Sequence, residues 1–246
     1  VAVFPADSSV NSNSTNDDFL QYEWPQIHGD SAFTRFSEGA APETTQTLWK
    51  TTIEGIQSYI TAFNGKVLVT TTTSVIALDK DTGTIIWNTT FPNSQRWPAV
   101  FKIDNERLVV GPYCVEIETG EILWISDKFS AKVSYWSESV YSPEEQMFYV
   151  HGDSVVEAWD FSNPSEPPAL AWETYISGST SSGTGIQYGD GKVFPGTFET
   201  YQIALNARTG DVLWETETNS AMSFSGSYYE GKLLKAGEQD NTFYCF

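Results

Sequence analysis

An eleven-residue motif recurs along the chain, and this repeat limits the possible folds more than any other feature. Each copy has a small residue first, an acidic or amide residue third, Thr-Gly at positions six and seven, and Trp at position eleven. Three copies, residues 77–87, 114–124 and 204–214, align without a gap. A fourth copy begins at Ala158 and ends at Trp172, and a loop four residues longer replaces its Thr-Gly turn.

Two partial copies flank the complete ones. Residues 47–49 (Thr-Leu-Trp) match the closing half of the motif, and residues 244–246 (Tyr-Cys-Phe) match its opening. The motif tryptophans are separated by 38, 37, 48 and 42 residues, or about 41 on average. This spacing is regular enough to make the repeat the structural unit of the chain.

The motif predicts a β-hairpin. A strand runs to the acidic or amide residue, turns at Thr-Gly, where glycine supplies a positive φ, and returns to Trp. The turn residues Asp79, Glu116, Asp160 and Asn206 recur once per repeat, which favours a role in capping the turn over metal binding. Two more short β-rich stretches precede each motif, and no segment shows a sustained helical period.

Four short strands in about 41 residues is the size of one blade of a β-propeller. We therefore predict an all-β fold, a β-propeller of four-stranded antiparallel blades, in which each motif forms the two outer strands of its blade. The many aromatic residues, 15% of the chain, agree with a β fold.

This motif resembles the tryptophan-docking motif of the pyrroloquinoline-quinone-like (quinoprotein) propeller superfamily. The resemblance extends from about Trp49 to Phe246. It implies that each motif Trp packs between neighbouring blades and donates its indole N–H to the backbone, beside a small residue. The docking residues so implied are Trp87, Trp124, Trp172 and Trp214, with Ala77, Ala158 and Ala204 and with Gly83, Gly120 and Gly210.

The segment before the first repeat has its own resemblance. Trp24-Pro25, His28-Gly29-Asp30 and Thr34-Arg35 are similar to the lead-in of secreted quinoprotein-like repeat proteins. Rings of this superfamily have seven or eight blades, so the chain is expected to hold about four to five of them. We expect a flexible polar leader over residues 1–23 and a propeller over residues 24–246 that is incomplete at its C-terminus.

The superfamily includes dehydrogenases and catalytically silent scaffolds. Its alcohol dehydrogenases carry two adjacent cysteines above the cofactor, whereas the two cysteines here are 131 positions apart. Its soluble glucose dehydrogenases rely on His and Arg residues, and only His28 and His151 are present here. We therefore predict a non-catalytic scaffold with no catalytic, cofactor-binding or metal-binding residues. The alternative is a quinone-dependent dehydrogenase that uses pyrroloquinoline quinone (PQQ) with calcium, and a sensory role, such as the outer domain of a receptor, also stays open.

The charge and composition of the chain argue against some classes of binding partner. With 13 basic and 32 acidic residues the net charge is −19, which argues against binding nucleic acid or an anionic membrane surface. No apolar stretch approaches the ~20 residues that a spanning helix needs. We expect protein partners or other copies of a surface assembly, and an extracellular, periplasmic or cell-surface location. Sequons at Asn13 and Asn88 permit N-glycosylation of an exported chain, although about two are expected by chance.

The remaining candidates have structural explanations. Cys114 and Cys245 occupy the small position of their repeats, so both are expected to be buried free thiols too far apart for a disulfide. His151, before Gly152-Asp153, is expected at a surface turn. A further set of aromatic residues fits either a central channel or packing between blades: Trp97, Tyr135, Trp136, Tyr188 and Tyr229.

Overall fold

The computed structural model describes residues 23–26, 29–34, 44–56, 60–95, 98–129, 139–152, 154–176, 185–222 and 226–246. Within them the chain forms nineteen strands in five antiparallel sheets, which confirms the predicted all-β fold. The predicted leader, residues 1–23, lies outside the described residues except for Glu23.

We name the five sheets blades 1 to 5 in chain order. Blades 1 to 4 have four strands each in the order of the chain, and blade 5 has three within the described residues. The strands are β1 (Thr61–Phe63), β2 (Lys66–Thr70), β3 (Ser74–Asp79) and β4 (Ile85–Thr90) in blade 1; β5 (Val100–Lys102), β6 (Arg107–Val110), β7 (Tyr113–Glu116) and β8 (Ile122–Ile125) in blade 2; β9 (Val140–Ser142), β10 (Met147–Gly152), β11 (Val155–Asp160) and β12 (Ala169–Tyr175) in blade 3; β13 (Ile186–Gly189), β14 (Lys192–Pro195), β15 (Tyr201–Asn206) and β16 (Val212–Glu217) in blade 4; and β17 (Ser227–Tyr229), β18 (Lys232–Ala236) and β19 (Phe243–Cys245) in blade 5.

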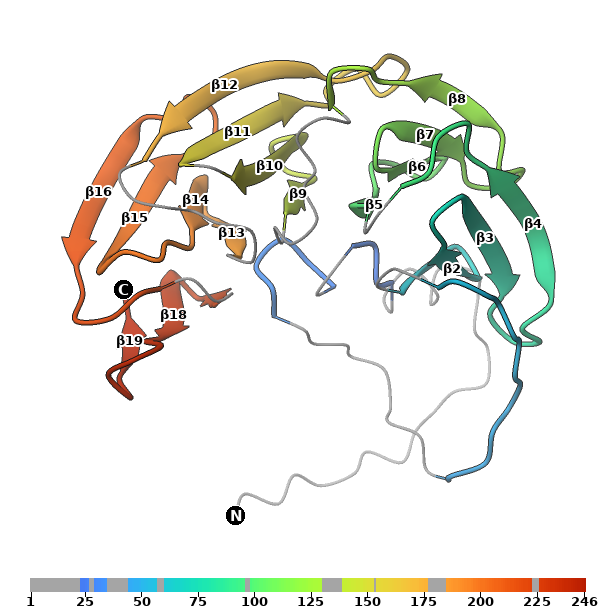
Figure 1. Cartoon of the computed structure of the whole chain (residues 1–246), viewed down its shortest axis with the longest axis horizontal. Coiled ribbons are helices and arrows are strands. Elements are labelled where there is room, and N and C mark those ends of the chain that lie inside the picture. Colours follow the sequence, from blue (N-terminus) through green and yellow to red (C-terminus); the bar gives the residue numbers. More distant parts are fainter. Residues whose placement is uncertain are drawn as a thin grey trace, which may run out of the picture.

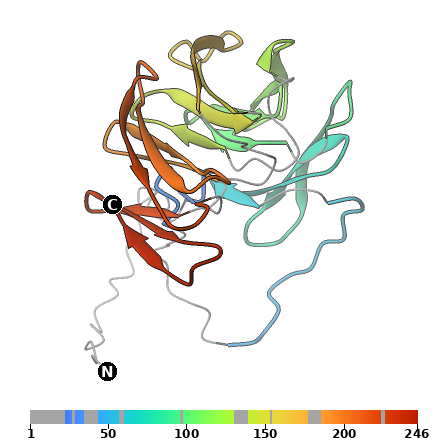
Figure 2. The ribbon, with the colours of Figure 1, turned by 60° about the vertical axis from the view of Figure 1, so that its left-hand side comes forward.

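The blades stand side by side in an arc (Figures 1 and 2). Figure 1 shows the first strands β5, β9 and β13 toward the centre of the arc and the fourth strands β4, β8, β12 and β16 at its rim. The motif supplies strands three and four of each complete blade, so the prediction that it forms the outer pair is confirmed. In all four complete blades the pairing of these two strands shifts register just before the motif Trp.

Apolar side chains from successive blades pack against each other. One buried cluster joins blades 3 and 4, where Tyr149 and Trp172 meet Ile186 and Val193. A second joins blades 1 and 2, and a third joins blades 2 and 3. The hydrophobic core therefore lies between the sheets, so each blade is stabilised by its neighbours.

Two sequence predictions about local structure are wrong. His151 is buried inside β10, opposite Val156, because the strand continues through Gly152 and the hairpin turns only after it. Residues 48–49 are not in a strand, since no neighbouring strand pairs with them in the described part of the chain.

Candidate functional site

Contacts between blades repeat the same hydrogen bond. The indole Nε1 of a motif Trp donates to a backbone carbonyl in the motif turn of the next blade. The bonds are Trp49 to Lys80 (2.9 Å), Trp87 to Ile117 (3.0 Å), Trp124 to Pro164 (3.0 Å) and Trp172 to Ala207 (2.9 Å). Trp124 reaches Pro164 because the longer loop of blade 3 replaces the usual turn. Trp214 is half-buried and stacks on Phe246 in blade 5, with ring centroids 6.1 Å apart.

The indole rings of Trp49, Trp87 and Trp172 pack against the motif glycines of the next blade. Gly83, Gly120 and Gly210 have φ values of 69°, 78° and 74°. A Cβ at Gly120 would lie 2.7 Å from the ring of Trp87, and one at Gly83 would lie 2.4 Å from the ring of Trp49. Glycine is therefore required twice, by the backbone conformation and by the space that the indole of the preceding repeat takes.

The small motif residues face the Trp of their own blade. Ala77, Cys114, Ala158 and Ala204 are fully buried, and each lies opposite the motif Trp on the adjacent strand. Burial raises the pKa of the Cys114 thiol to about 12, so it is protonated at neutral pH. The prediction that Cys245 is buried is wrong: it is exposed, because no strand of the described chain covers the outer side of β19.

A threonine two residues after the motif Trp makes a second contact between blades, which the motif did not predict. Its hydroxyl donates to the carbonyl of the motif glycine in the next blade. The pairs are Thr51 with Gly83 (2.5 Å), Thr89 with Gly120 (2.5 Å) and Thr174 with Gly210 (2.7 Å). The signal was available, because Trp-x-Thr follows four of the five motif tryptophans.

The acidic and amide residues of the motif cap its turn. The Asp79 carboxylate accepts hydrogen bonds from the hydroxyl of Thr82 (2.8 Å) and from its backbone N–H (2.8 Å), which lower the pKa of Asp79. Glu116 accepts the same pair from Thr119, and Asn206 accepts from the N–H of Thr209. The predicted capping role is confirmed.

Residues 23–26 and 29–34, which we call the axial segment, contact the inner edges of all five blades. One backbone N–H from the first strand of every blade donates to this segment. The bonds run from Ala62 to the Trp24 carbonyl (3.0 Å), Lys102 to the Pro25 carbonyl (2.9 Å), Tyr141 to Gln26 Oε1 (3.0 Å), Tyr188 to the Ser31 carbonyl (2.9 Å) and Tyr228 to the Ala32 carbonyl (2.9 Å). The pairing register of all five blades puts these donors at one position of the repeat.

Gln26 completes this set with its side chain. Its Oε1 accepts from the Tyr141 N–H, and its Nε2 donates to the Tyr141 carbonyl at 2.9 Å, as the backbone of a neighbouring strand would. The Gln26 residue is only 4% exposed. The amide therefore gives blade 3 the edge partner that the backbone of the axial segment gives the other blades.

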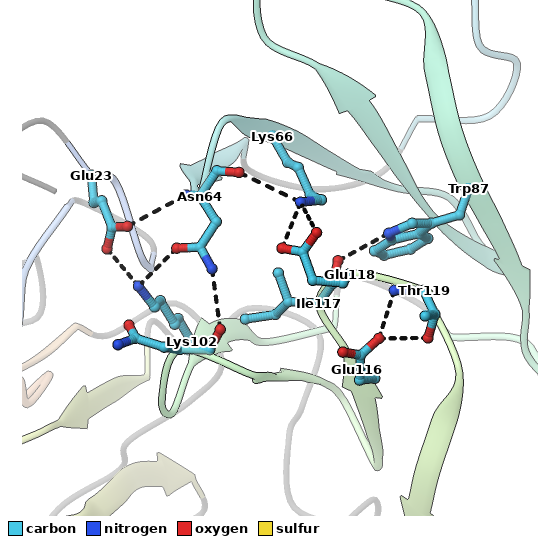
Figure 3. A network of polar contacts seen from close by, with 10 residues as sticks. Glu23, Asn64, Lys66, Trp87, Lys102, Glu116, Ile117, Glu118 and Thr119 are labelled. Carbon is cyan, nitrogen blue, oxygen red and sulfur yellow. Dashed lines mark hydrogen bonds and ion pairs between the residues drawn. The ribbon is translucent and has the colours of Figure 1, made fainter. Parts of the chain in front are cut away.

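A polar network joins the axial segment to blades 1 and 2 (Figure 3). Lys102 Nζ lies 2.7 Å from Glu23 Oε2, and both side chains are largely buried. Asn64, in the turn of blade 1, donates its amide to the Asn105 carbonyl of blade 2 at 3.1 Å. Lys66 of blade 1 forms an ion pair with Glu118 of blade 2 at 2.7 Å. These contacts fix the two blades and the segment relative to one another.

A second charged group joins blades 3 and 4. Arg208 Nε lies 2.7 Å from the buried Glu145 carboxylate. The Tyr188 hydroxyl lies 2.9 Å from Glu144 and 3.1 Å from Glu145, and burial raises its pKa. Tyr188 thus packs between blades, whereas Tyr229 is exposed. Trp97, Tyr135 and Trp136 lie outside the described residues.

The residues at the axis do not fit the quinone and calcium that the resemblance implies. One N–H group of each inner strand is already hydrogen-bonded to the axial segment. Across the described residues, no group of three or more His, Cys, Asp or Glu side chains is placed to hold a metal ion. His28 and Asn13 lie outside the described residues, and Asn88 is exposed on β4. The part of the chain that the structure describes contains no helix that could cross a membrane.

The chain is similar to known proteins in both sequence and fold. Residues 38–156 match the family described as outer membrane protein assembly factor BamB. BamB from Moraxella catarrhalis is similar in structure, with a TM-score of 0.51 and 14% identity over 78% of this chain and 64% of that one. No curated protein sequence matches the chain.

Two quinohemoprotein alcohol dehydrogenases are similar as well. ADHIIG from Pseudomonas putida HK5 gives a TM-score of 0.57 at 15% identity, over 97% of this chain and 49% of that one. The enzyme from Comamonas testosteroni gives 0.56 at 14% identity, over 92% and 45%. The chain thus spans between 45% and 64% of the length of these three structures. At such identities the likeness shows the fold alone.

Proposed function

Because the chain is a β-propeller built from PQQ-like repeats, we propose that it is a non-catalytic module that binds other proteins outside the cytoplasm. Its place would be the periplasm, the cell surface or the extracellular space. Its partners would be proteins, or other copies of a surface assembly. Function on this fold resides in particular sites, so the proposal depends on what occupies the axis and the surface.

The axial segment is the observation that carries this proposal. It takes one N–H from the inner strand of each of the five blades, so the inner edges of the blades are paired with the chain itself. A cofactor bound there would have to displace Gln26, whose amide makes two hydrogen bonds to buried backbone. Displacement would leave both Tyr141 groups unpaired at a cost of about 2–6 kcal/mol.

The comparisons support a role in binding proteins. The matching family is described as an assembly factor, and its structure from Moraxella catarrhalis has a similar fold. The net charge of −19 favours protein partners over nucleic acid. An exported location agrees with the outer-membrane context in the description of that family.

The test is a titration of the purified full chain with pyrroloquinoline quinone and calcium, with absorbance, fluorescence and dye reduction as readouts. We expect no stoichiometric uptake of quinone and no dye reduction with alcohols. A quinohemoprotein alcohol dehydrogenase, stripped of quinone and treated in parallel, is the positive control. Tight uptake with dye reduction would establish the dehydrogenase instead.

A further inference from the structure

The outer strand of blade 1 presents a sequon to solvent. Asn88 and Thr90 lie two residues apart on β4, so their side chains project from the same face of the strand, and both are exposed. Between them, Thr89 points the other way and donates to the Gly120 carbonyl of blade 2. The acceptor amide and the hydroxyl of the sequon are thus accessible in the folded chain.

This strand is the outermost of its sheet. Such an edge exposes unpaired backbone groups and can pair with strands of other chains unless side chains prevent it. Beside the sequon, Ile85 is 53% exposed and Ile86 is 46% exposed. No residue of β4 is charged.

The equivalent strands of blades 3 and 4 carry carboxylates at this position. The residue after the motif Trp is Glu173 in β12 and Glu215 in β16, and β16 ends with Glu217. All three are exposed and lie on an edge strand, where charge opposes pairing with another chain. In blade 1 the residue at this position is Asn88, which is neutral unless modified.

We propose that Asn88 carries an N-linked glycan that shields the outer edge of blade 1, as glutamates shield blades 3 and 4. A glycan is bulky and hydrophilic, so it covers the exposed isoleucines and blocks the approach of another strand. The outer strand of blade 2 is short, β8 having four residues, and Asp127 follows it. The proposal rests on the proposed export of the chain, because only exported chains receive such glycans.

The test is secretion of the full chain from a host that N-glycosylates, alongside Asn88→Gln and Asn88→Glu variants. Peptide mass mapping after enzymatic deglycosylation locates the glycan. Sedimentation velocity at matched concentrations measures self-association. Circular dichroism and the melting temperature check that all three chains are folded. We expect both variants to fold, because the Asn88 side chain is exposed.

We expect a glycan on Asn88 and a monomeric wild-type chain. Asn88→Gln should lack this glycan and self-associate, and Asn88→Glu should lack it and stay monomeric, because it restores the charge found in blades 3 and 4. An unmodified Asn88 would overturn the proposal. It would also fail if Asn88→Gln were as monomeric as the wild type, or if Asn88→Glu associated as strongly as Asn88→Gln. Quinone uptake would overturn the scaffold role without changing these outcomes.

Discussion

Glu118 and Arg208 carry opposite charges at the same position of the repeat, four residues after the small motif residue. Each forms an ion pair with a residue of the preceding blade. Glu118 lies 2.7 Å from Lys66 of blade 1, and Arg208 lies 2.7 Å from Glu145 of blade 3. In both pairs the partner from the preceding blade is buried and the motif residue is exposed. The charges are thus exchanged, and the partners in the preceding blade also differ in position: Lys66 is the first residue of β2, whereas Glu145 lies in the turn before β10. Each interface therefore favours its own neighbour.

We predict that Glu118→Lys destabilises the chain by about 1–3 kcal/mol, because it leaves the buried Lys66 beside a like charge. Exchanging both residues (Lys66→Glu with Glu118→Lys) should recover at least about 1 kcal/mol of that loss. Urea unfolding of the single and double variants gives the coupling energy. A coupling energy of zero would mean that the pair does not contribute to the interface.

Two alanine variants separate the two reasons for glycine in the motif, the positive φ and the close contact with the indole. Gly120 and Gly65 both have positive φ, 78° and 70°, but only Gly120 lies against an indole, and nothing lies within 4 Å of a Cβ at Gly65. Gly65→Ala should cost about 1 kcal/mol from strain alone. Gly120→Ala should cost about 3 kcal/mol or more, because Trp87 must also move. Equal costs in urea unfolding would refute the indole contact.

Motif tryptophans should stabilise the chain in proportion to their burial. Trp124 is 8% exposed and donates a hydrogen bond to the Pro164 carbonyl, whereas Trp214 is only half-buried. Trp124→Ala should cost about 3–5 kcal/mol, and Trp214→Ala about half as much. Urea melts test both, and a Trp124→Ala chain as stable as the parent would exclude a docking role for that residue.

The two thiols should differ in reactivity. Cys245 is exposed, whereas Cys114 is buried with its pKa raised to about 12, so its reactive thiolate does not form near neutral pH. A thiol reagent at pH 8 should modify one thiol of the native chain and two in denaturant. Cys114→Ala should leave the native reaction unchanged. Rapid modification of both native thiols would contradict the burial of Cys114.

The sequence predicted those features that repeat. The recurrence of Gly and Trp identified the blades and their outer hairpins, because a geometry used several times leaves several copies of its signature. Trp-x-Thr was equally visible, but its role appears only when two blades are placed side by side. The burial of His151 was missed because Gly152 reads as a turn although β10 runs through it.

Features that occur once could not be found in the same way. Nothing in the sequence shows that Gln26 pairs with Tyr141, a contact that links residues 115 positions apart. The partners of Lys66 and Glu145 likewise depend on which blades are neighbours. Cys245 was expected to be buried by analogy with Ala204, but the analogy fails because, in the part of the chain that the structure describes, no strand pairs with the outer side of β19.

Amide hydrogen exchange tests the central claim, that the axial segment pairs with the inner strand of every blade, most directly. The readout is the N–H groups of Ala62, Lys102, Tyr141, Tyr188 and Tyr228, resolved residue by residue by NMR. All five should exchange slowly in the native full chain, and Gln26→Leu should accelerate Tyr141 most. Exchange of these five amides as fast as in an unpaired edge strand would show that the inner strands are not paired with the axial segment, and would contradict this account.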